Sequence, residues 1–206
     1  MEQKDTTGIV PPQYTGKEIS VQSSTEFQID HEAKQFFDVA KERLFDVNNW
    51  HNIVQGITAN FQVVNASGKE LKREVQKGDY LRIDIPGPGS MAGHGYDWVH
   101  VEDVKEVAED SLQSIGFRVR PSENPLGDQE NTAHFYDHSA TSNFIVTREG
   151  NKVIALVIEK NLKPNLDTDS LTDKIRDATV GTTALMGLSR IQWQNLVDGI
   201  VKIVFV

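Results

Sequence analysis

The amino-acid sequence predicts an α+β fold in which an antiparallel sheet of about seven strands holds one long C-terminal helix. The first observation is an apolar stripe at helical spacing between Asp169 and Val206, typical of a helix with one buried face. The second is that most of the preceding chain alternates between apolar and polar residues, as half-buried strands do. The third is that short turns such as Lys77-Gly78-Asp79 join these segments, and short turns favour antiparallel neighbours.

The composition argues against several functional classes. The chain has 206 residues, no cysteine and a net charge of −9, which disfavours disulfides, thiol chemistry and binding to nucleic acid or anionic membranes. No apolar run approaches the ~18 residues of a membrane span, and the N-terminus lacks the regions of a signal peptide. We expect a cytoplasmic monomer or homodimer without a cofactor, a metal or membrane insertion.

The first 18 residues differ from the rest of the chain. Residues 1–18 are polar and contain Pro11-Pro12, which predicts an extended arm or a disordered tail. Alternatively, this arm packs on the domain or on a neighbour through Ile9, Val10 and Tyr14. Residues 19–206 are expected to form a single domain.

The strand and helix signals follow one another without a linker. A first strand over Val21–Ile29 precedes a helix capped by Asp30, and a short second helix or turn carries Trp50 inward. The following predicted strands are Ile57–Val63, a short return around Leu71 and Val75, Tyr80–Ile85, Trp98–Val107, Ile115–Val119, a long or bulged strand His134–Arg148, and Val153–Ile158. The last is apolar at every position and is therefore predicted to be buried on both faces.

The C-terminal helix is predicted to start at N-cap candidates between Asp167 and Ser170. At ~1.5 Å per residue, a continuous helix would be about 50 Å long. Its stripe includes Leu185, whereas Trp193 lies off the stripe and is expected to pack on the sheet edge or on a partner.

This order of elements resembles the helix-grip fold of the SRPBCC superfamily, which includes START domains, birch-pollen-allergen-like proteins and polyketide cyclases. The resemblance covers roughly residues 19–205. It is carried by FDVAKERLFDVNNW with its closing Trp50, by the meander of hairpins, and by the terminal segment LTDKIRDATVGTTALMGLSRIQWQNLVDGIV. The resemblance implies a curved sheet wrapped around the last helix, with an apolar cavity between them.

Two clusters contain the residue types that metal sites and acid–base catalysis use. The first consists of His94, Tyr96, Asp97, Trp98 and His100, and the second of His134, Tyr136, Asp137 and His138. Alternate residues of an extended strand share a face, so two such strands side by side would gather these groups. The spacing is not diagnostic of a metal, and the same residues also serve as polar contacts to a ligand or as rim residues.

Other polar segments allow two interpretations each. The glycine-rich residues 87–95 fit G-x-G-x-x-A superficially, but no helix follows them, so a cavity lid or a plain hairpin connection is expected rather than a nucleotide site. Arg118, Arg120 and Arg148 are expected on a solvated face, or as anion anchors if they point inward. The polar run Ser139–Asn143 offers hydroxyls to a ligand or marks a bulge.

Three functional hypotheses remain open. The favoured one is binding of a hydrophobic or amphipathic small molecule, lipid-like or polyketide-like, in a cavity. The alternatives are a cyclase, aromatase or hydrolase-type enzyme using cavity-mouth His, Tyr and Asp, and a ligand-free interaction or regulatory module. No residue is assigned to catalysis or to a metal. The predicted ligand-binding residues are Trp50, His94, Tyr96, Trp98, His100, His134, Tyr136, His138, Asn143 and Leu185.

Overall fold

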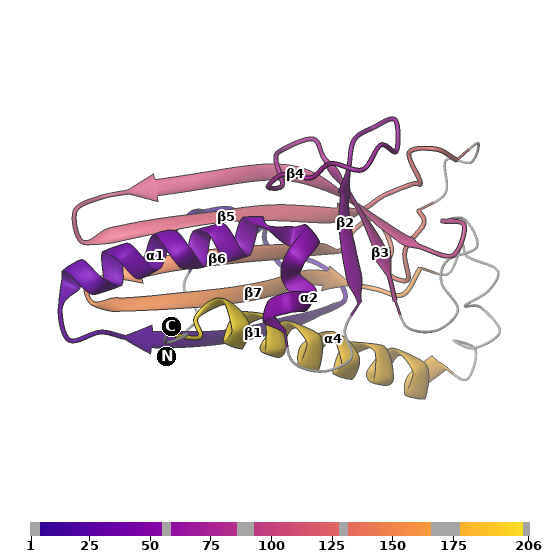
Figure 1. Cartoon of the computed structure of the whole chain (residues 1–206). Helices are drawn as coiled ribbons and strands as arrows, with labels where there is room; N and C mark the ends of the chain where they lie inside the picture. Colours follow the sequence, from indigo (N-terminus) through magenta and orange to yellow (C-terminus); the bar gives the residue numbers. More distant parts are fainter. Residues whose placement is uncertain (1–4, 55–58, 86–92, 128–131, 166–177, 204–206) are drawn as a thin grey trace.

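Seven strands form one antiparallel sheet in the order β1-β7-β6-β5-β4-β3-β2. The computed structural model describes residues 5–54, 59–85, 93–127, 132–165 and 178–203, with side chains of the last helix described from Met186 onward. The elements are β1 (Lys17–Glu26), α1 (Asp30–Phe45), the 3-10 turn η1 (Val47–Asn49), α2 (Trp50–Ile53), β2 (Asn60–Val64), β3 (Tyr80–Asp84), β4 (Asp97–Ala108), β5 (Leu112–Pro121), β6 (Thr141–Glu149), β7 (Lys152–Leu162) and α4 (Ala178–Ile200). This is a helix-grip fold, and it confirms the predicted α+β class (Figure 1).

The inner face of the sheet, which meets α1 and α4, carries the main core. Helix α1 buries Ala33, Phe37, Ala40 and Leu44, whose spacing places them on one stripe. Helix α4 contributes Trp193, Leu196, Val197 and Ile200 to the same cluster. Inward residues of every strand complete this core, since alternate residues of a strand point to the same face.

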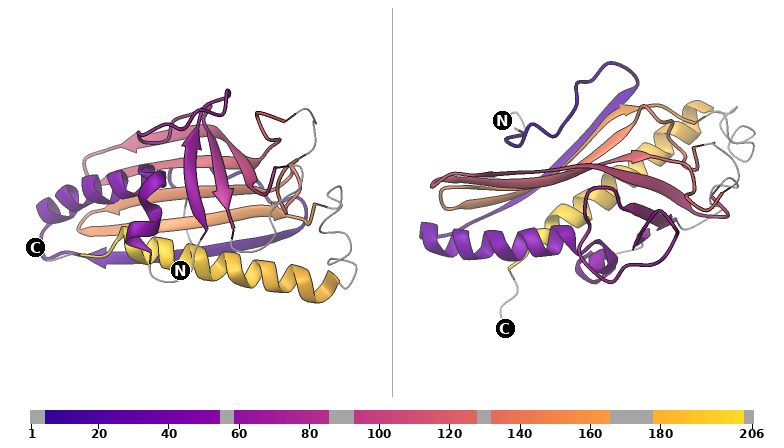
Figure 2. Two further views of the ribbon diagram at one scale, coloured as in Figure 1. Left: turned by 45° about the vertical axis from the view of Figure 1, so that its right-hand side comes forward. Right: turned by 90° about the horizontal axis from the view of Figure 1, so that it is seen from above.

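The outer face of the sheet is covered in part by the N-terminal arm, residues 5–16, which lies on the side opposite to α1 (Figure 2). Ile9 is fully buried and packs against Ile145, Leu156 and Ile158. The arm is fixed by Arg118, which donates to the Ile9 carbonyl at 2.8 Å. Strand β7 is therefore buried on both faces, as its apolar sequence predicted, because the arm covers the side that the helices leave open.

One predicted strand is correct only in its second half, and another is wrong. The chain from His134 to Ala140 does not extend β6, which begins at Thr141. The Asp137 carboxylate accepts the Ser139 backbone N–H at 2.8 Å, and this local bond turns the chain before it reaches the sheet. Around Leu71, the predicted return strand is reduced to one isolated bridge between Val64 and Glu70.

Arg148 is not solvated, contrary to the prediction. It points to the inner face beneath α1 and is 1% exposed. Its guanidinium donates to Asp30 Oδ1 at 2.7 Å and to Gln113 Oε1 at 2.7 Å, and to the carbonyls of Asp110 and Gly150. Asp30 is thus the first residue of α1 and the partner of a buried cation, whereas Ile29 occupies the N-cap position.

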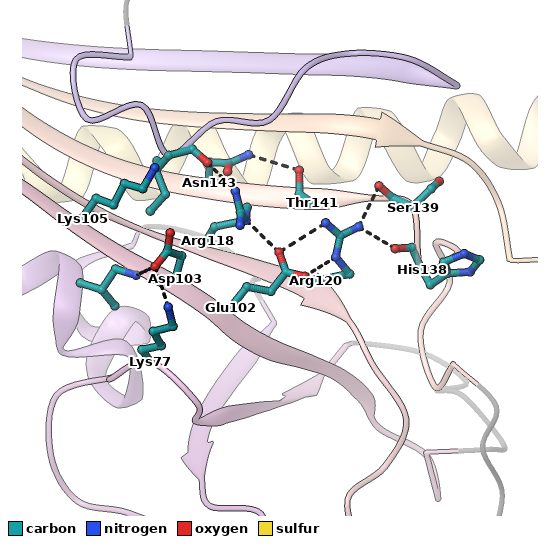
Figure 3. Close-up of polar contacts among 12 residues, drawn as sticks. Lys77, Glu102, Asp103, Lys105, Arg118, Arg120, His138, Ser139, Thr141 and Asn143 are labelled. Carbon is teal, nitrogen blue, oxygen red and sulfur yellow. Dashed lines mark hydrogen bonds and ion pairs between the residues drawn. The ribbon is translucent and has the colours of Figure 1, made fainter.

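Arg118 and Arg120 lie on the outer face, where Glu102 bonds to both of them (Figure 3). Arg120 also donates to the His138 carbonyl at 2.8 Å. Burial acts to raise the pKa of Glu102, but hydrogen bonds and charge from the two arginines outweigh it and hold that pKa below its usual range. These arginines are half-buried structural groups that attach the arm and the 138–139 turn to the sheet.

Candidate functional site

A cavity of about 90 Å³ lies between the inner face of the sheet and α4. Its apolar wall includes Phe61, Leu81, Ile83, Val99, Val119 and Phe144. Its polar groups are His134, Ser142, Glu159, Ser189, Gln192 and Trp193. An apolar pocket with a few convergent polar groups is the usual form of a small-molecule site.

The aromatic wall of the cavity is built around Trp193. This indole packs against Phe144 at 5.1 Å and Phe61 at 6.0 Å between ring centroids. Behind them lies Trp50, whose Nε1 donates to the carbonyl of Leu44 at 3.1 Å. Trp193 therefore faces the cavity rather than the sheet edge or a partner, because the sheet curves around α4 and brings β2 and β6 to this side of the helix.

Glu159 is a carboxyl group buried in this apolar setting. It follows the inward residues Val153, Ala155 and Val157 of β7 and is 2% exposed. Ser142 Oγ donates to its Oε1 at 3.0 Å, whereas Oε2 has no hydrogen-bond partner among the described residues.

Burial raises the pKa of Glu159 to about 7, against the opposing effect of the nearby Trp193 indole and the Ser142 hydroxyl. The Trp193 Nε1 lies near the carboxyl without meeting hydrogen-bond geometry. The pKa of Glu159 thus lies close to neutral pH, where the group is able to donate or accept a proton.

Tyr136 lies near this carboxyl, and His134 lines the same cavity. The Nδ1 of His134 accepts the backbone N–H of Tyr136 at 3.0 Å, and burial lowers the pKa of His134 to about 3. The imidazole is thus neutral, and its proton is on Nε2 because Nδ1 is the acceptor. The Tyr136 hydroxyl is buried without a hydrogen-bond partner in the described part of the chain, and burial followed by the charge of Glu159 raises its pKa.

Of the nine residues predicted to bind a ligand whose side chains the structure describes, only His134 lines the cavity, and Tyr136 lies beside it. Trp50 packs behind the aromatic wall. The side chain of Leu185 lies outside the described residues, as do most of the glycine-rich loop and the predicted N-cap of the C-terminal helix.

The two histidines of the first cluster, His94 and His100, do not line the cavity. Trp98 and His100 alternate with Val99 and Val101, which face inward, so they point to the outer face. Trp98 packs with Val64 and Ala133, and His100 packs on the Tyr80 ring at 4.9 Å. In the preceding turn, His94 is exposed and has a left-handed φ of 54°, while the Tyr96 ring stacks under Arg82.

The second cluster is split by the turn before β6. His138 is exposed, whereas His134 and Tyr136 are buried. Asn143 is also buried, but on the outer face, where its Nδ2 donates to the Ile158 carbonyl at 2.8 Å. The histidines do not converge, and the described residues contain no group of three or more side chains suited to a metal.

Glu159 and Trp193 are the functional candidates that the sequence interpretation missed. A signal for Glu159 was present: it has the same strand parity as Val153, Ala155 and Val157, so it had to point inward. A single carboxyl at an inward position of an apolar strand is costly unless it is protonated or paired, so such a position indicates a functional site.

The fold is similar to several solved structures at low sequence identity. A protein from Thermus thermophilus matches with 13% identity and a TM-score of 0.39, covering 90% of this chain and 94% of that one. A START superfamily protein from Mycobacterium smegmatis matches with 12% identity and a TM-score of 0.33, covering 84% and 97%. Norcoclaurine synthase from Thalictrum flavum matches with 9% identity and a TM-score of 0.35, covering 92% and 97%.

The sequence comparisons give no family assignment. No protein-family model and no curated protein matches the chain. No helix among the described residues is long and apolar enough to cross a membrane.

Proposed function

We propose that the protein binds a hydrophobic or amphipathic small molecule in the cavity between the sheet and α4. The observation that carries this proposal is an apolar cavity that stays open although large aromatic side chains surround it. A well-packed interior leaves few voids larger than a water molecule, so retained space beside unpaired polar groups favours a ligand site.

The cavity volume limits the enclosed part of the ligand. About 90 Å³ is small beside the roughly 300–1,000 Å³ of drug-sized ligand pockets. The buried portion would therefore be one small ring or a short chain, held by Phe61, Phe144 and Trp193.

Native mass spectrometry of the purified protein, followed by titration with ethylbenzene monitored by NMR chemical shifts, tests this proposal. The variant Val119→Phe places a ring in the cavity and is expected to lose binding. Ile191→Phe, on the exposed face of α4 where Ile191 is 61% exposed, is the matched control and should retain it. A protein that retains no ligand, binds no apolar probe and forms a dimer by light scattering would instead support an interaction module.

A second candidate function is acid–base catalysis, favoured by the Glu159 pKa of about 7 inside the cavity. Groups with a pKa near the working pH are efficient proton carriers. In this second proposal the proton-transferring group is Glu159, with Tyr136 beside it, and not the histidines that the sequence suggested. Exchange of the methyl protons of acetophenone in D₂O, followed by NMR, would reveal this activity, and Glu159→Gln should abolish it. Equal exchange by both proteins would exclude Glu159 as the base.

A further inference from the structure

The polar residues that line the cavity include Trp193, His134 and Glu159, and we call the part that they form its polar end. This polar end is rich in hydrogen-bond donors. The Trp193 indole N–H can only donate, and it is buried near the Glu159 carboxyl without completing a hydrogen bond to any described residue. His134 also lines the cavity, and its Nδ1 is occupied by the backbone N–H of Tyr136. Nε2 therefore carries the only N–H of this neutral ring, and it is the second donor that a lining residue of the cavity can provide.

Among the residues that the structure describes, this end holds no positive side chain to pair with an anion. Neither lysine nor arginine occurs in the described lining of the cavity. Glu159 lies among these donors and would repel a carboxylate or phosphate whenever it is ionised. An anionic ligand would thus find no counter-ion among these described residues, and burying an unpaired charge is strongly unfavourable.

We infer that the polar end binds the carbonyl oxygen of an uncharged, otherwise apolar molecule, such as an aryl or alkyl ketone. This inference rests on the proposed ligand-binding function and names the class of ligand. A carbonyl oxygen has two lone pairs and no proton, so it matches two N–H donors. The rest of the molecule would contact Phe61 and Phe144.

Selectivity follows from the cost of leaving donors unpaired. Water can serve the Trp193 and His134 donors in the empty cavity. A hydrocarbon would displace that water and return no acceptor, whereas a ketone replaces it. An amine would present N–H groups to N–H groups and would have to form a buried ion pair with Glu159, which desolvation disfavours.

A matched series on one carbon skeleton tests the inference in the wild-type protein at pH 6. The probes are acetophenone, ethylbenzene and 1-phenylethylamine, with phenylacetate as the anion, and affinities are measured by NMR titration or calorimetry. Acetophenone is expected to bind roughly 10- to 100-fold more tightly than ethylbenzene, given the usual cost of an unpaired buried donor. The amine and the carboxylate are expected to bind more weakly than acetophenone.

The variant Trp193→Phe should reduce the preference for acetophenone over ethylbenzene. Trp98→Phe is the matched control, because Trp98 lies on the outer face and its Nε1 donates to the Gly93 carbonyl, and it should leave the preference unchanged. The wild-type series decides the inference even if Trp193→Phe does not fold.

The outcomes separate this inference from the proposed function. Equal affinity for ethylbenzene and acetophenone would overturn the inference and leave ligand binding intact. Tighter binding of the amine would overturn it in favour of ion pairing with Glu159, and tighter binding of phenylacetate would overturn it in favour of an anion site. Failure of all four probes to bind would overturn both proposals.

Discussion

Replacing Glu159 by Gln is expected to remove a pH-dependent part of the stability of this protein. Glu159 is almost completely buried in the cavity wall and bonds to Ser142 through one oxygen. Its pKa of about 7 in the folded protein lies above its ordinary value of 4.5. The folded state therefore holds this proton more tightly than the unfolded state.

The sign and magnitude follow from that difference. Between pH 4.5 and pH 7 the unfolded chain has lost the proton while the folded protein keeps it, so the free energy of unfolding falls as pH rises. One pKa unit corresponds to about 1.4 kcal/mol. Binding of this proton by Glu159 contributes about 3 kcal/mol to the free energy of unfolding, relative to the ionised group. That contribution is fully present below pH 4.5 and is lost progressively as pH rises through about 7.

Urea unfolding at a series of pH values from 4 to 8 measures this effect as the difference between the wild type and Glu159→Gln. Taking the difference cancels other carboxylates, such as Glu102, whose lowered pKa acts in the opposite direction at low pH. The variant should be about as stable as the wild type at pH 4 and about 3 kcal/mol more stable at pH 8. Glu149→Gln, at an exposed site at the end of β6, provides the control with the same change in charge. A difference that stays constant from pH 4 to 8 would refute a buried, protonated Glu159.

Three further predictions concern packing. Arg148→Met should destabilise the protein by about 2–4 kcal/mol, because it removes several buried charge-assisted hydrogen bonds. Urea unfolding measures this loss of stability. A loss as small as that caused by the exposed control Arg190→Met would contradict the prediction. Ile9→Ala should lower the free energy of unfolding by about 2–4 kcal/mol, because Ile9 is fully buried against the sheet. The exposed control Ile191→Ala should lower it by about 0.5 kcal/mol or less. Gly116→Ala should destabilise β5, since a Cβ there would lie 2.6 Å from the Phe144 carbonyl oxygen; an unchanged thermal midpoint would show that the neighbouring strand yields freely.

The candidate site was harder to predict than the fold, because it depends on which strand residues face inward. Side chains of β4 alternate between the two faces of the sheet, as the sequence predicted. Because Val99 points inward, the next residue, His100, points outward. The error lay in assuming that chemically versatile residues would share the cavity. In the second cluster, the Asp137 carboxylate accepts hydrogen bonds from the backbone N–H and the hydroxyl of Ser139, and the chain turns there, so His134 and His138 separate. Such local competition between a side chain and the sheet cannot be read from alternation alone.

The sequence by itself determined the α+β class, the order of elements and the double burial of β7, since these depend on periodicity and on turns a few residues long. Only the tertiary structure decided that Trp193 and Glu159 face one cavity. They are 34 positions apart in the sequence and come together because the curved sheet wraps around α4 (Figure 2). The raised pKa of Glu159 could not be predicted from the sequence either. It is set by the water that folding removes from around the carboxyl, and that depends on every element that closes over it.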